Sequence, residues 1–77
     1  MEKLLNILTG VKPYIDAETF LNTKDLYGEG VIDSLDILMI LEEINVAYEI
    51  EIDAAGFTKE DFRTVNDILN MIKINGG

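Results

Sequence analysis

Ser34 is the residue of this chain that is best placed to do chemistry. It lies in the segment GVIDSLD (30–36), where a glycine-containing loop delivers a serine to the start of a strongly helical pattern. A hydroxyl in the first turn of a helix lies beside unpaired backbone N–H groups, at the positive end of the helix dipole. That setting stabilises a phosphate attached to the hydroxyl. Aspartate followed by serine is also typical of a simple helix cap, so these residues alone leave both interpretations open.

The composition excludes most other kinds of chemistry. The 77 residues include no histidine and no cysteine, so the Ser-His and Cys-His catalytic pairs and the usual nitrogen and thiolate metal ligands are missing. Six basic against fifteen acidic residues give a net charge of −9, which repels nucleic acid and anionic lipid and attracts basic protein surfaces. No apolar run approaches the roughly 18 residues that span a bilayer, and the N-terminal segment lacks the features of a signal peptide. We therefore expect a cytoplasmic protein with no catalytic residues and no metal site.

Helices of one small domain, spanning residues 1–77, are predicted to position Ser34. A first helix is expected to end near residue 12, and an irregular segment from 13 to 31 is expected to form a long loop anchored by Phe20 and Leu26. Asp33 and Asp36 form a capping-box-like start for the strongest helix. The core face of that helix is predicted to carry Ile37, Ile40, Leu41, Ile44 and Tyr48.

Two more helix starts are indicated by a threonine followed three residues later by an aspartate. They predict a short helix near 58–62 and a last helix that carries Val65, Ile68, Leu69 and Ile72. The alternating segment 46–52 is interpreted as a frayed helix end and a linker, because a lone strand has no partner. Phe57 and Phe62 are expected in the core, and Gly76-Gly77 is expected to be a disordered tail. The predicted fold is all-α: a small four-helix bundle of three main helices and one short helix, with a long first loop.

The acidic four-helix pattern, the long first loop and the GVIDSLD motif together resemble the acyl carrier protein family over nearly the whole chain. In that family the serine of the D-S-L motif carries 4′-phosphopantetheine, whose thiol holds acyl or aminoacyl groups as thioesters. The resemblance implies that Ser34 is the attachment site, and that the thiol arrives with the prosthetic group. It implies that Asp33 and Asp36 help engage a phosphopantetheinyl transferase and its divalent cation. Further implied partners of this monomer are an acyl- or aminoacyl-loading ligase and downstream transferases with basic surfaces.

Apolar residues on the outer side of the strongest helix are candidates for partner docking. On a helical wheel these apolar residues lie away from the core face and among carboxylates. Together with two of the neighbouring glutamates they are here called the docking strip: Leu35, Leu38, Met39, Glu42, Glu43 and Val46. An apolar strip rimmed by acids suits transient docking of basic, partly apolar surfaces. Scattered surface leucines are also normal in proteins without such a role. Met39 and Glu42 differ from residues common in the family, which implies a different set of partners.

The segment 52–68 helps to distinguish kinds of carrier. It lacks the proline that is usual in carriers of fatty-acid synthesis, and its pattern GFTKEDFRTVNDI resembles the corresponding region of D-alanyl carrier proteins. The principal prediction is a carrier of acyl or aminoacyl thioesters. The first alternative is a D-alanyl carrier protein for D-alanylation of cell-wall teichoic acid. The second alternative is an unmodified acidic interaction module.

Overall fold

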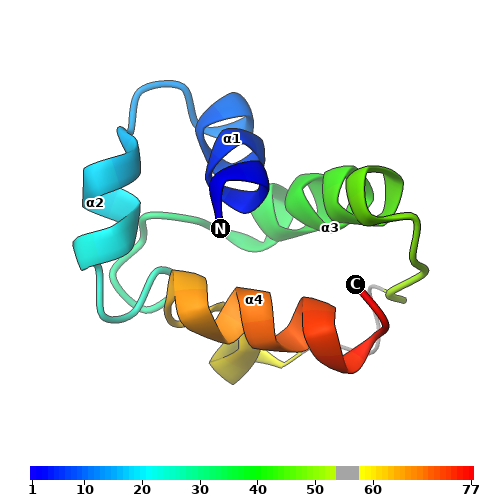
Figure 1. Ribbon diagram of the computed structural model, residues 1–77. Coiled ribbons are helices and arrows are strands. Elements are labelled where there is room, and N and C mark those ends of the chain that lie inside the picture. Colours follow the sequence, from blue (N-terminus) through cyan, green and yellow to red (C-terminus); the bar gives the residue numbers. More distant parts are fainter. Residues whose placement is uncertain (54–57) are drawn as a thin grey trace.

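The computed structural model describes residues 1–53 and 58–77, and the regular secondary structure of these residues is entirely helical. The elements are α1 (Glu2–Val11), α2 (Ala17–Asn22), α3 (Ser34–Tyr48), a 3-10 turn η2 (Lys59–Phe62) and α4 (Val65–Ile74) (Figure 1). The predicted all-α bundle of three main helices and a short helix near 58–62 is confirmed. Within the described residues, no helix is long and apolar enough to cross a membrane.

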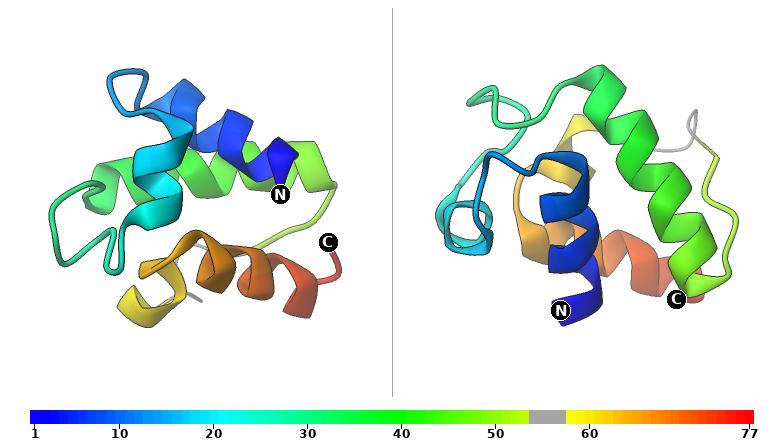
Figure 2. Two further views of the ribbon diagram at one scale, coloured as in Figure 1. Left: turned by 60° about the vertical axis from the view of Figure 1, so that its left-hand side comes forward. Right: turned by 90° about the horizontal axis from the view of Figure 1, so that it is seen from above.

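Buried side chains from all of these elements form one core. α1 packs on α2 and on α3, and η2 leads directly into α4 (Figure 2). The side chains with the least exposure are Leu4, Leu8, Phe20, Leu26, Ile32, Ile37, Ile40, Ile44, Phe62, Ile68 and Ile72. Of the predicted core residues, Tyr48 and Leu69 are only partly buried against this cluster. Phe62 is confirmed as a core residue, whereas Phe57 lies outside the described residues.

Short polar motifs set the starts of α3 and α4, as predicted. The Asp33 carboxylate accepts the backbone N–H of Asp36 at 2.9 Å, and the backbone N–H of Asp33 donates to the Asp36 carboxylate at 3.0 Å. Thr64 and Asp67 make the same reciprocal pair at the start of α4. Each pair satisfies two backbone donors that would otherwise lack partners, so the first turn of each helix is fixed by neighbours in sequence.

The segment 13–31 differs from the predicted long loop because it contains α2. The Asp16 carboxylate accepts the backbone N–H of Thr19 at 2.8 Å and so caps this helix. Six residues are too few for a helical period to be visible in the sequence, and the burial of Phe20 against α1 and the core stabilises the helix instead. The backbone N–H of Leu26 donates to the Arg63 carbonyl at 2.7 Å, which ties the second half of the segment to η2.

The residues after α3 are held more firmly than a frayed end. Glu49 ends the helix in the left-handed conformation, with φ 54°. The Asn45 side-chain amide then accepts the backbone N–H of Ile52 at 2.8 Å and donates to the Ile52 carbonyl at 3.1 Å. Ile52 is buried. The predicted linker is held in place at this residue, because a side-chain amide supplies the hydrogen bonds that a neighbouring strand would supply.

The C-terminal glycines also differ from the predicted disordered tail. Gly76 adopts a φ of 93°, which is open to glycine and strained for other residues. The backbone N–H of Gly77 donates to the Ile72 carbonyl at 2.9 Å, and that of Gly76 donates to the Lys73 carbonyl at 3.2 Å. These two bonds form a Schellman motif, which satisfies carbonyls at the end of α4.

Candidate functional site

Ser34 is the first residue of α3 and is exposed to solvent. The preceding residue, Asp33, supplies the helix cap, so the serine hydroxyl is free for other contacts. Its Oγ atom lies 3.3 Å from the hydroxyl oxygen of Tyr27, and either group can donate the hydrogen bond. The structure therefore places the predicted serine at a helix start, with its hydroxyl open to a partner or a reagent.

Asp33 and Asp36 lie on either side of Ser34, as predicted, but in different surroundings. Lys12, from the end of α1, pairs with the Asp36 carboxylate at 3.1 Å. Asp33 is exposed, and the backbone N–H of Asp36 that donates to its carboxylate holds the pKa of Asp33 below its usual value. Asp33 is therefore ionised at neutral pH and faces solvent, whereas the charge of Asp36 is compensated by Lys12.

Sequence reasoning missed two of the residues around Ser34. Neither Lys12 nor Tyr27 was among the predicted site residues. Tyr27 is seven positions from Ser34 through an irregular segment, so no helical or strand period connects the two residues. Their contact depends on the turn formed by 27–33, which a one-dimensional pattern does not describe.

A cavity of about 360 Å³ lies beside Tyr27 and carries basic side chains. The Lys59 ammonium nitrogen is 5.2 Å from the centroid of the Tyr27 ring. The residues lining the cavity are Asp25, Tyr27, Gly28, Lys59, Glu60 and Arg63. Tyr27 is thus shared between this cavity and the Ser34 hydroxyl.

The apolar members of the docking strip are exposed, as expected. Leu35, Leu38, Met39 and Val46 keep between 46% and 74% of their surface in contact with solvent, and both glutamates of the strip are exposed. The opposite side of α3 carries the buried Ile37, Ile40, Leu41 and Ile44. α3 therefore has a core face and a solvent face, and Ser34 lies at its N-terminal end.

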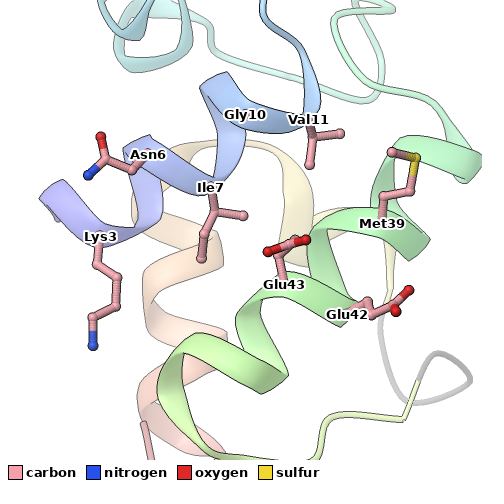
Figure 3. A pocket seen from close by; sticks show the side chains of 8 residues that line it. All are labelled: Lys3, Asn6, Ile7, Gly10, Val11, Met39, Glu42 and Glu43. Atoms are coloured by element: carbon pink, nitrogen blue, oxygen red, sulfur yellow. The ribbon is translucent and has the colours of Figure 1, made fainter.

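A groove of about 510 Å³ lies between α1 and α3, and only part of the docking strip lines it (Figure 3). Met39, Glu42 and Glu43 line it from α3; Lys3, Asn6, Ile7, Gly10 and Val11 line it from α1. Leu35, Leu38 and Val46 are not among its lining residues. A Cβ atom at Gly10 would meet no other atom within 4 Å, so the groove has room for a methyl group at this position. The contribution of α1 was missed because a helical wheel of one helix does not show which neighbour lies beside it.

Known proteins similar to this chain are D-alanyl carrier proteins. The chain is 36% identical to that of Streptococcus uberis over 65% of its own length and 63% of the relative's. It is 34% identical to that of Lactococcus lactis subsp. cremoris over 57% of its own length and 56% of the relative's. It is 26% identical to that of Streptococcus suis over 90% of its own length and 85% of the relative's.

These first two matches span 63% and 56% of the length of the curated relatives. No family model matches the chain, and no solved structure matches it. The resemblance to carrier proteins that the GVIDSLD motif and the segment 52–68 predict is nevertheless confirmed, since the relatives are themselves named as carriers: this chain is similar in sequence to D-alanyl carrier proteins.

Proposed function

We propose that residues 1–77 are a single carrier domain that holds acyl or aminoacyl groups as thioesters on 4′-phosphopantetheine attached to Ser34. The domain delivers these groups between cytoplasmic enzymes and catalyses no reaction itself. The observation that carries the proposal is the position of Ser34, exposed at the first residue of α3 with the cap supplied by Asp33. The similarity to D-alanyl carrier proteins supports it independently.

The residues around Ser34 fit the prosthetic group. The hydroxyl is exposed and contacts the Tyr27 hydroxyl, so a transferase can reach it without unfolding α3. A phosphodiester at this position would lie at the positive end of the helix dipole. When bound, the group supplies the thiol that forms the thioester, which this chain lacks because it has no cysteine.

Asp33 and Asp36 have separate roles in this proposal. The Asp33 carboxylate is exposed and ionised, so it is the one available to a phosphopantetheinyl transferase and its divalent cation. Asp36 is engaged by Lys12 and by the backbone N–H of Asp33, so it chiefly holds the helix start in place.

The docking strip is proposed to receive partner enzymes. With a net charge of −9, the domain attracts basic surfaces, which raises the rate of encounter. Leu35, Leu38 and Val46 offer apolar contact on the outer side of α3, and the groove lined by Met39 extends the contact onto α1. The partners in this proposal are the transferase, a loading ligase and downstream transferases.

An aminoacyl cargo is the more specific candidate. The relatives that this chain matches are named D-alanyl carrier proteins, which favours D-alanine, delivered for D-alanylation of teichoic acid, over a fatty acyl chain. The two cargoes are separated by offering the phosphopantetheine-loaded protein either D-alanine with ATP and a D-alanine-activating ligase, or a fatty acid with ATP and an acyl-activating ligase. A mass gain of one D-alanyl group with the first enzyme alone supports the aminoacyl role.

The attachment itself is tested by intact mass spectrometry after incubation with coenzyme A and a phosphopantetheinyl transferase. The wild-type chain is expected to gain one phosphopantetheinyl group. Ser34 is the only serine of the chain, so Ser34→Ala should gain none, while the matched hydroxyl variant Thr23→Ala should gain the group normally. Circular dichroism should show that Ser34→Ala stays folded, because Asp33 keeps the cap.

Two results would count against the proposal. Mass gain in Ser34→Ala would place the attachment elsewhere. No gain in the wild-type chain would favour the unmodified acidic interaction module instead.

A further inference from the structure

Two of the six basic residues of this acidic chain line one cavity with Tyr27, whose hydroxyl contacts Ser34. Lys59 and Arg63 line the cavity of about 360 Å³ that also contains Tyr27. Among the described residues, neither side chain has a carboxylate within ion-pair distance, whereas Lys12 is paired with Asp36. Asp25 and Glu60 line the same cavity, but Asp25 is engaged in accepting the backbone N–H of Gly28 at 2.8 Å.

Backbone hydrogen bonds hold this basic pair in place relative to Ser34. The N–H of Leu26 donates to the carbonyl of Arg63 at 2.7 Å, and the N–H of Ile32 donates to the carbonyl of Leu26 at 3.1 Å. Leu26 and Ile32 are both buried. The turn that carries Tyr27 is therefore fixed at one side to η2 and at the other to the start of α3, so the position of the cavity beside Ser34 is built into the fold.

A phosphodiester on Ser34 would need charge compensation at this place. Its nearest ionised neighbour in sequence is Asp33, whose carboxylate is exposed and carries no ion pair among the described residues. Two anions in contact repel each other, and the net charge of −9 adds to the repulsion. The helix dipole offsets part of this cost, and a nearby cation would offset more.

We infer that Tyr27 and Lys59, with Arg63 in the same cavity, form an anion site for the phosphodiester of the group attached to Ser34. The inference rests on the proposed function. The Tyr27 hydroxyl is already within hydrogen-bond distance of Ser34 Oγ and donates to a phosphate oxygen placed there. Lys59 rests over the Tyr27 ring on a flexible four-carbon stem, so its ammonium group can move to the phosphate without a change in the backbone.

The test uses ³¹P NMR of the protein loaded with phosphopantetheine, with complete loading confirmed by intact mass. The quantity measured is the difference in ³¹P chemical shift of the phosphodiester between the folded protein and the same protein in concentrated urea. Tyr27→Phe keeps the ring beneath Lys59 and removes the hydroxyl; Lys59→Gln removes the charge. Each variant is expected to lose half or more of the wild-type difference. Raising the salt concentration should reduce the difference in the wild-type protein and leave Lys59→Gln nearly unchanged.

Matched controls make the same chemical changes elsewhere. Tyr14→Phe removes a phenol from a residue that is 96% exposed, and Lys73→Gln removes a charge at the far end of α4. Both should keep the wild-type difference. A difference that is the same in all five proteins would overturn the anion site while leaving the carrier function intact. A wild-type chain that gains no phosphopantetheinyl mass would overturn both.

Discussion

Truncation of two leucines on opposite faces of α3 separates stability from docking. Leu41 is 2% exposed in the core, whereas Leu38 is 46% exposed on the docking strip. A buried Leu→Ala change costs about 2–5 kcal/mol, because it removes transfer free energy and leaves a cavity. Leu38→Ala removes the same atoms, but these atoms are only about half buried and their loss opens no cavity. At roughly 0.8 kcal/mol per buried CH₂, the expected cost is about 1 kcal/mol.

Thermal unfolding followed by circular dichroism measures this contrast. For a domain of this size, 1 kcal/mol corresponds to a change in melting temperature of about 4–8 °C. Leu38→Ala should therefore lower the melting temperature by that amount, and Leu41→Ala by at least about twice as much. Both variants lie in one helix and change the same side chain, so helix propensity cancels from the comparison.

The second half of this prediction is the transfer reaction. At a temperature where both variants are folded, the loaded Leu38→Ala protein should exchange its cargo with the ligase several-fold more slowly than wild type, while Leu41→Ala should be close to wild type. Equal losses of stability in the two variants would mean that Leu38 belongs to the core. Unchanged transfer by Leu38→Ala would remove it from the docking strip.

Three further changes test other parts of the structure. Asn45→Ala should lower the free energy of unfolding by about 2–3 kcal/mol, since two hydrogen bonds to Ile52 are lost in a part-buried place; a loss below about 0.5 kcal/mol in urea unfolding would contradict this role. Gly10→Ala should stabilise the chain by about 0.5–1 kcal/mol, because the added Cβ meets open space within a helix, and an unchanged or lower melting temperature would show that the glycine serves the fold. Asp33→Asn tests the lowered pKa of Asp33. The ionised Asp33 carboxylate stabilises the folded chain at pH values above the ordinary pKa of an aspartate. This stabilisation is lost as the pH falls below about 4 toward the lower pKa of Asp33 in the folded chain. The variant should therefore lose less stability than wild type between pH 5 and pH 2, and parallel acid unfolding curves would refute the assignment.

The features predicted correctly are those determined by residues a few positions apart. The starts of α3 and α4 follow from residues three apart, and the buried face of α3 follows from the helical period of Ile37, Ile40 and Ile44. The position of Ser34 was predictable for the same reason, since it adjoins the cap residue Asp33. The exposure of Leu38 followed from its direction on the same helix.

The features missed depend on which segments meet in space. α2 is too short for its own period to be seen, and it is stabilised by burial of Phe20. The contacts of Tyr27 with Ser34 and of Asn45 with Ile52 join residues seven positions apart across irregular backbone. The groove at Gly10 requires the placement of α1 against α3, which no pattern within either helix contains.

The reciprocal caps at Asp33–Asp36 and Thr64–Asp67 have a consequence for how fast the chain folds. Each cap joins residues three positions apart, so the first turns of α3 and α4 can form without waiting for a distant segment. Helical domains rich in such local contacts fold in about microseconds to milliseconds. The slower step is then closure of the Leu26–Arg63 hydrogen bond, which brings residues from two halves of the chain together. Substitutions at the caps and substitutions that weaken the Leu26–Arg63 contact should therefore both slow folding, whereas contacts that form after this closure should mainly affect the unfolding rate.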